Sequence, residues 1–238
     1  MGKIITPIVL LPGLGADAEL FYPQQEHFGE QLRVCTGPAF ETLQSHSPSL
    51  SKAAEFTAEL IRDSVSNDDR FILGGMSFGG SLAMEMVRMD LLKPSAIVLI
   101  SSNRTSSTLS DGFRWQQRIG SKLPTRLIRS GLGFASRVFA YRESLSSDQT
   151  ARLRRMAGRA NIEQLLWGAQ AIDRWKADED SLAGVTIPIH QIHGVADWVI
   201  PIHRQHVTKC LDDGRHLITW THSHHVNRLI ESAQLEER

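Results

Sequence analysis

The stretch Phe71-Ile-Leu-Gly-Gly75-Met-Ser77-Phe-Gly79-Gly80 decides the fold. A short apolar run ends in the pattern G-x-S-x-G, and the helical sequence Ser81-Leu-Ala-Met-Glu-Met-Val-Arg follows directly. This order predicts a strand, a sharp turn that carries Ser77, and a helix. Glycine is expected at 75 and 79, because side chains there would collide with neighbouring backbone. The pattern therefore indicates an exposed serine that can act as a nucleophile.

Short β-prone runs alternate with helix-length amphipathic segments along most of the chain. This alternation predicts an α/β fold, with a mainly parallel sheet flanked by helices. The predicted strands are Ile8 to Leu11, Leu32 to Thr36, Phe71 to Gly74, Ile97 to Ser101, Ile187 to Ile192 and Leu217 to Trp220.

Composition narrows the class of protein. The 238 residues are 41% hydrophobic and 22% charged, which is enough to bury the core of one α/β domain. Lys+Arg and Asp+Glu both total 26, so no basic excess favours nucleic acid as a partner. Cys35 and Cys210 cannot build a disulfide framework and predict free thiols in a reducing, cytoplasmic setting. No apolar run reaches the roughly 20 residues of a transmembrane helix, which predicts a soluble protein.

One long segment breaks the alternation of strands and helices. Residues 103–176 contain no convincing strand, so we expect a helical cap over 103–184, inserted into a core formed by 1–102 and 185–238. Residues 103–176 hold 14 Lys/Arg against 5 Asp/Glu, whereas the rest of the chain holds 12 against 21. A solvated surface is one interpretation of this charge. Steering of an anionic substrate, an acyl thioester carrier or an anionic membrane surface is another.

A serine hydroxyl needs a base and an orienting acid, expected here in the order Ser, Asp, His. Asp197 follows the predicted strand Ile187 to Ile192, at the end of the sheet where sites of parallel sheets are built. The last predicted strand leads into a histidine-rich loop. We select His224 as the base, by its distance past that strand, with His225 second and His222 third.

The oxyanion that forms on attack needs two preorganised N–H donors. Phe78, the residue after the nucleophile, is expected to supply one of them. The other is expected from the glycine-rich loop after the first strand, where the N–H of Leu14 is our candidate.

Together these motifs resemble the α/β-hydrolase superfamily, in its branch of small esterase- and lipase-like serine hydrolases with a helical cap. The resemblance covers about residues 4–102 and 185–238. It implies a triad of Ser77, Asp197 and His224 that hydrolyses a small-molecule ester or thioester, without a cofactor or a metal. Two positions depart from the usual pattern, namely Pro12 before Gly13 in place of histidine and Ser223 before His224 in place of glycine. The second departure leaves the choice among the three histidines open.

The same residues also allow other functions. Gly13-Leu-Gly15-Ala-Asp-Ala18 matches the dinucleotide pattern G-x-G-x-x-A, but no acid ends the second predicted strand. Eight of the ten histidines lie at or beyond position 190, yet they form no compact ligand set for a metal. A non-catalytic or lyase-type protein that binds a small ligand under the cap is the main alternative to a hydrolase.

Overall fold

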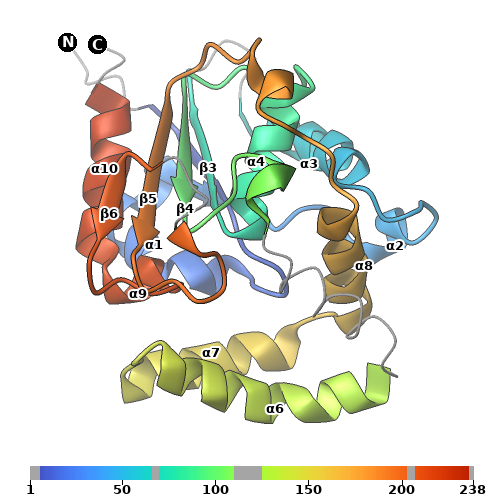
Figure 1. The fold of residues 1–238 in the computed structure, drawn as a ribbon, viewed down its shortest axis with the longest axis vertical. Helices are drawn as coiled ribbons and strands as arrows, with labels where there is room; N and C mark the ends of the chain where they lie inside the picture. The colour runs from blue at the N-terminus through green and yellow to red at the C-terminus, as the bar shows by residue number, and fades with distance from the viewer. Residues whose placement is uncertain (1–5, 66–69, 110–124, 203–206, 236–238) are drawn as a thin grey trace.

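The computed structural model describes residues 6–65, 70–109, 125–202 and 207–235. Its sheet has six parallel strands in the order β2-β1-β3-β4-β5-β6 (Figure 1). The strands are β1 (Ile8–Leu11), β2 (Leu32–Val34), β3 (Ile72–Met76), β4 (Ala96–Ile100), β5 (Ile189–Gly194) and β6 (Lys209–Leu211). The predicted α/β fold is therefore confirmed.

The last predicted strand, Leu217 to Trp220, is wrong. Its residues enter the short helix α9 (Ile218–Thr221), and β6 is the sixth strand instead. Trp220 accounts for the helix, because its buried indole N–H donates to the Leu20 carbonyl at 2.8 Å. Tertiary contacts here override the β propensity of an Ile-Thr-Trp sequence.

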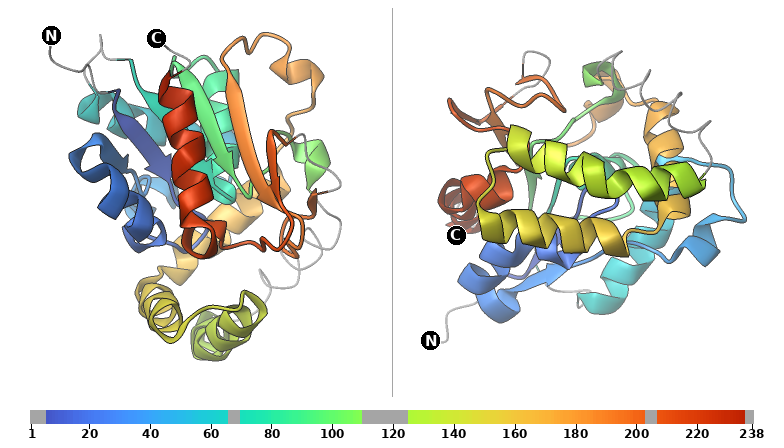
Figure 2. Two further views of the ribbon diagram at one scale, coloured as in Figure 1. Left: turned by 90° about the vertical axis from the view of Figure 1, so that its left-hand side faces the viewer. Right: turned by 90° about the horizontal axis from the view of Figure 1, so that it is seen from below.

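Helices cover both faces of the sheet (Figure 2). One face packs against α3 (Leu50–Ser64), α4 (Phe78–Arg88) and α8 (Ile162–Asp173). The other face packs against α1 (Tyr22–Phe28), α9 and α10 (Ser223–Leu235). The remaining helices within the described residues are α2 (Phe40–Leu43), α6 (Thr125–Arg142) and α7 (Ser147–Arg159), with 3-10 turns η1 (Ala18–Phe21), η2 (Gly29–Gln31), η3 (Ser106–Thr108) and η4 (Asp180–Leu182).

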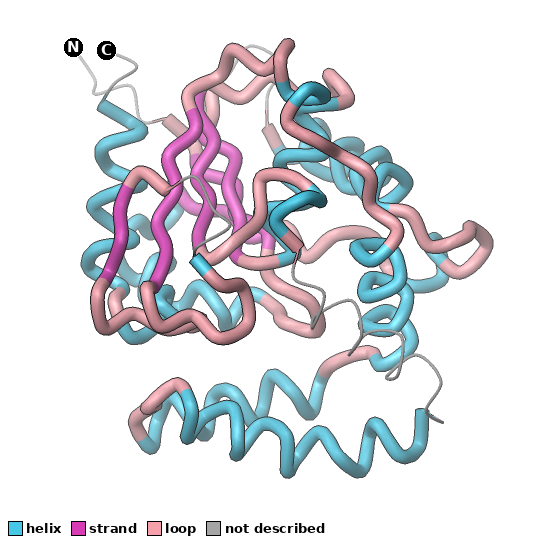
Figure 3. The backbone as a smooth tube through the Cα atoms, viewed as in Figure 1, coloured by secondary structure: helices cyan, strands magenta, loops and turns pink. Residues whose placement is uncertain are grey.

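The α6 and α7 helices pack together beyond the carboxyl ends of the strands, outside both helical layers (Figure 3). The chain then returns through α8, which contacts α2 and α3. Residues 110–124 of the predicted cap lie outside the described residues, and the division at 103–184 stays a prediction. None of the described helices is long and apolar enough to cross a membrane.

Candidate active site

Ser77 lies between β3 and α4, where the chain turns sharply. Its backbone has φ 56° and ψ −122°, a positive-φ conformation that residues other than glycine rarely adopt. Two hydrogen bonds hold the turn. The Ser77 N–H donates to the Ile100 carbonyl at 3.0 Å, and the Ser102 hydroxyl donates to the Ser77 carbonyl at 2.6 Å. The strand, turn and helix expected from G-x-S-x-G are all present.

Gly75 and Gly79 let this turn pack closely against the sheet. A Cβ on Gly75 would lie 2.4 Å from the Gly79 carbonyl carbon, and a Cβ on Gly79 would lie 2.1 Å from the Leu11 carbonyl oxygen. Backbone atoms cannot yield to contacts this short. The start of α4 therefore reaches the end of β1 only because both positions are glycine.

The loop after β1 lies against the turn at Ser77. A Cβ on Gly13 would lie 3.5 Å from the Ser77 Cβ, so the adjacent Leu14 is held beside the serine. Phe78 is the first residue of α4, where helix N–H groups lack intrahelical acceptors. Ser77, Leu14 and Phe78 line one cavity of about 30 Å³. The structure thus brings together the predicted nucleophile and the two residues predicted to bind the oxyanion.

Asp197 lies in the loop after β5 and is 4% exposed. Its Oδ1 accepts hydrogen bonds from the N–H groups of Val199 at 2.9 Å and Ile200 at 2.8 Å. Its Oδ2 faces Nδ1 of His216 at 2.9 Å and Nε2 of His193 at 3.2 Å. Three hydrogen-bond donors therefore fix the orientation of this buried carboxylate, and the His193 ring, whose Nε2 also contacts the Ile200 carbonyl at 2.7 Å, lies beside it.

His216 lies in the loop between β6 and α9 and is buried. The loop that carries His216 packs closely against the loop that carries Asp197. The backbone segments approach so closely that a Cβ on Gly194 would lie 2.3 Å from the Gly214 carbonyl carbon. An ionised carboxylate only accepts hydrogen bonds, so Nδ1 of His216 carries the hydrogen that points to Asp197. In the neutral imidazole, Nε2 is then the free base.

The structure does not place the predicted base, His224, at Asp197. His224 is exposed in α10, and its ring packs against that of His225 at 5.8 Å. His222 pairs through Nε2 with Oδ1 of the exposed Asp213 at 3.0 Å. Within the described residues, none of these three histidines hydrogen-bonds to Asp197.

This difference follows from the wrongly predicted last strand. The predicted base lies in the segment after Leu217 to Trp220, whereas the loop that follows β6 comes earlier in the chain and contains His216. The sequence Asp212-Asp213-Gly214 marks a turn, and His216 comes two residues after its glycine. That turn is the sequence signal that could have pointed to His216, the histidine that contacts Asp197.

Asp197 and His216 shift each other's pKa. Burial alone would raise the pKa of Asp197, but the charge of His216 and hydrogen bonds from both His193 and His216 hold it well below its ordinary value. Burial alone would lower the pKa of His216, but the charge and hydrogen bond of Asp197, followed by the charge of Glu143, raise it above 6.5. The result is an ionised acid beside a histidine of increased basicity.

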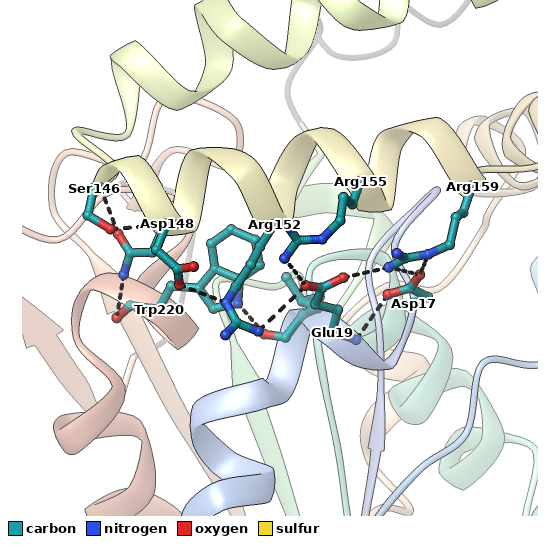
Figure 4. A network of polar contacts seen from close by, with 10 residues as sticks. Asp17, Glu19, Ser146, Asp148, Arg152, Arg155, Arg159 and Trp220 are labelled. Atoms are coloured by element: carbon teal, nitrogen blue, oxygen red, sulfur yellow. Dashed lines mark hydrogen bonds and ion pairs between the residues drawn. The ribbon is translucent and has the colours of Figure 1, made fainter.

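Arginines of α7 pair with two acidic residues that follow the β1 loop (Figure 4). Arg155 and Arg159 reach Glu19 at 3.1 and 2.6 Å, and Arg159 also pairs with Asp17 at 2.7 Å. These pairs attach α7 to η1 and neutralise part of the positive charge counted over residues 103–176. Steering of an anionic substrate stays a prediction that depends on the remaining arginines.

Comparison with known proteins places this geometry in context. A family model described as "Alpha/beta hydrolase family" matches residues 8–235. No curated protein sequence gives a match.

Solved structures of similar fold include two esterases and a further hydrolase. A thermophilic esterase from Thermogutta terrifontis aligns with a TM-score of 0.77 and 18% identity, over 97% of this chain and 90% of that one. An esterase from Exiguobacterium antarcticum aligns with a TM-score of 0.75 and 17% identity, over 96% and 92%. A meta-cleavage product hydrolase from Pseudomonas fluorescens aligns with a TM-score of 0.72 and 20% identity, over 98% and 92%. At such identities these structures show a common fold.

Proposed function

We propose that this chain, which belongs to the alpha/beta hydrolase family, is a serine hydrolase that cleaves an ester or thioester through an acyl-enzyme intermediate. The observation that carries the proposal is the 2.9 Å contact between Nδ1 of His216 and Oδ2 of Asp197. Both residues and Ser77 follow strands of one parallel sheet, so all three lie at the end of the sheet where the carboxyl ends of the strands meet. His216 takes the role that the sequence assigned to His224.

In the first step, Oγ of Ser77 attacks the substrate carbonyl carbon while Nε2 of His216 accepts the hydroxyl proton. Asp197 keeps Nδ1 protonated, so the ring presents the correct nitrogen. The same carboxylate stabilises the imidazolium that forms.

The tetrahedral intermediate places negative charge on the former carbonyl oxygen. The N–H groups of Leu14 and Phe78 stabilise this oxyanion, and the N-terminus of α4 adds its partial positive charge. His216 then protonates the departing alcohol or thiol. In the second half, His216 deprotonates a water molecule, which attacks the acyl-enzyme carbonyl. It then returns that proton to Oγ of Ser77 as the carbon–oxygen bond to the serine breaks, which releases the acid and free Ser77.

A second cavity offers room for the acyl group. It has a volume of about 420 Å³, within the usual range of small-molecule sites, and it shares Leu14 and Phe78 with the cavity at Ser77. Apolar side chains such as Leu82, Leu165 and Trp167 form much of its wall. These walls favour an apolar acyl group of moderate size over a strongly charged one.

Labelling with a fluorophosphonate probe, followed by peptide mass mapping, tests the nucleophile. The proposal expects covalent labelling at Ser77 in the native protein and none in Ser77→Ala, with both proteins folded by circular dichroism. Labelled protein should then hydrolyse neither p-nitrophenyl acetate nor a thioester analogue. A folded native protein that stays unlabelled would refute the hydrolase and favour the ligand-binding alternative.

A further inference from the structure

Glu143 is a buried acid at the corner between α6 and α7, far in sequence from the proposed triad. Only 2% of it is exposed, and it lies at the C-terminal end of α6. Burying a carboxylate lowers the stability of the folded protein unless both of its oxygens are hydrogen-bonded. The partners of this one identify its role.

The two oxygens of Glu143 bind the two loops that carry the acid and the base. Oε1 accepts the indole N–H of Trp198, the residue after Asp197, at 2.7 Å. Oε2 accepts the backbone N–H of Leu217, the residue after His216, at 2.7 Å. One side chain from the inserted helices thus bridges both loops, each one residue away from a catalytic group.

Neighbouring residues strengthen this junction. The Phe139 ring lies 5.1 Å from the Trp198 ring and 6.4 Å from that of His216, between centroids. The Arg142 guanidinium lies over the Trp198 ring at 4.2 Å. From the other loop, the Arg215 guanidinium donates to the carbonyl of Arg142 and to the Ser144 hydroxyl. The corner after α6 is therefore fixed to the loops of the acid and of the base.

We infer that Glu143 is a positioning residue, which holds Asp197 and His216 in register through its hydrogen bonds to the loops that carry them. The inference rests on the proposed function, because it concerns the same site. Glu143 acts on the reaction through its two loop contacts and through its charge. It has no proton-transfer role of its own.

The charge of Glu143 gives a readout that a merely structural contact would not affect. Within the described residues, the charged or titratable groups packed around His216 and its junction are Asp197, Glu143, His193, Arg142 and Arg215. Glu143 adds to the effect of Asp197 in raising the pKa of His216. Removing this charge should lower that pKa, whereas loss of packing alone has no reason to do so.

The test compares Glu143→Gln with the native protein. Glutamine keeps the shape but has a single acceptor oxygen, so one loop contact is lost together with the charge. We expect labelling of Ser77 by the fluorophosphonate to slow roughly tenfold. We also expect the pKa of His216, followed by NMR of its ring, to fall. An unchanged pKa, or a labelling rate within twofold of the native rate, overturns the inference.

Two further variants make the result specific. Asp148→Asn removes an exposed carboxylate of α7 that pairs with Arg152, and it should leave both readouts unchanged. If Glu143→Gln does not fold, Trp198→Phe tests the same bridge, because it removes the indole N–H that Glu143 accepts and keeps an aromatic ring against Phe139 and Arg142. That variant should label more slowly without a lower pKa of His216, and a native rate overturns the inference. The NMR titration needs no turnover, so a wrong junction and a wrong hydrolase assignment give different results.

Discussion

Asp197 and His216 meet across 2.9 Å although 19 residues separate them in the chain. They follow β5 and β6, which are neighbours in the sheet, so their loops emerge side by side. Ser77 follows β3, which is separated from β5 by the single strand β4. The proposed triad is therefore assembled by parallel strand order, and it depends on the loops holding their short contacts.

The choice of base gives the first prediction. His216→Ala should lower kcat/KM for p-nitrophenyl acetate by roughly 10⁴-fold, because the proton of Ser77 then has no positioned acceptor. His224→Ala should stay within twofold of the native enzyme, since His224 is exposed in α10. Steady-state kinetics of the two variants side by side separates them. A larger loss in His224→Ala would return the base to the histidine selected from sequence.

Asp197→Asn tests the acid. An amide can donate toward Nδ1 of His216, which stabilises the wrong tautomer, so kcat should fall by roughly 10⁴-fold. The amide also loses charge-assisted bonds from the N–H groups of Val199 and Ile200, which should lower the free energy of unfolding. Pre-steady-state acylation measures the first effect and urea unfolding the second. Near-native acylation would show that another residue orients the base.

The pH dependence follows from the two pKa shifts. His216 accepts a proton only when neutral, and its pKa is raised, so kcat/KM should rise with pH through a midpoint above 6.5. Asp197 has a lowered pKa and stays ionised throughout that range, so it should add no second step. A profile of p-nitrophenyl acetate hydrolysis between about pH 5 and 9 checks both statements. A midpoint below 6.5 would contradict the assignment of His216 as the base.

Sequence reasoning succeeded where a local pattern and the fold agree. The G-x-S-x-G turn needs glycine at 75 and 79, because a Cβ there would lie only 2.4 and 2.1 Å from neighbouring backbone atoms. The glycines in the sequence therefore reveal the geometry of the turn. Asp197, the proposed acid, follows a long apolar strand, which the sequence shows directly. His216, the proposed base, is not indicated by the sequence because β6 has only three residues. Leu217 to Trp220 resembles a strand instead, but it folds as a helix around a buried Trp220. Long-range packing decided that segment, and a single sequence does not show such packing.

The role of Glu143 was equally hidden from sequence. It is one acid in a basic segment, and nothing beside it indicates burial or a partner more than 50 residues away. Its contacts arise only when the corner between α6 and α7 packs on the loops after β5 and β6. The same holds for Glu19, whose arginine partners lie more than 130 residues further along the chain.

Two glycine substitutions test the packing of the turn at Ser77. Gly79→Ala places a Cβ 2.1 Å from the Leu11 carbonyl oxygen, so it should lower the free energy of unfolding by at least about 2 kcal/mol and abolish labelling of Ser77. Gly131→Ala is the control, because its Cβ meets nothing within 4 Å in α6. Alanine there should stabilise the protein by about 0.5–1 kcal/mol. Urea unfolding of both variants is the measurement, and equal stabilities would contradict the close approach of α4 to β1.

Gly168 tests whether the acyl group enters the larger cavity. A Cβ on Gly168 in α8 would lie 2.6 Å from the Leu14 Cδ2, the end of a flexible side chain that lines both cavities. Gly168→Ala should therefore displace this side chain and leave the fold intact. We expect kcat/KM for a p-nitrophenyl ester of an eight-carbon acyl group to fall roughly tenfold more than that for the acetate, about 1.4 kcal/mol of lost discrimination.

The matched control is Gly158→Ala in α7, where a Cβ has nothing within 4 Å. Its effect should be equal for the two esters, because Leu14 keeps its position. Measuring both esters with both variants separates a change in the acyl site from a general loss of activity. If Gly168→Ala reduces the two rates in the same proportion, the long acyl group does not pass the Leu14 side chain, and the larger cavity is not its site.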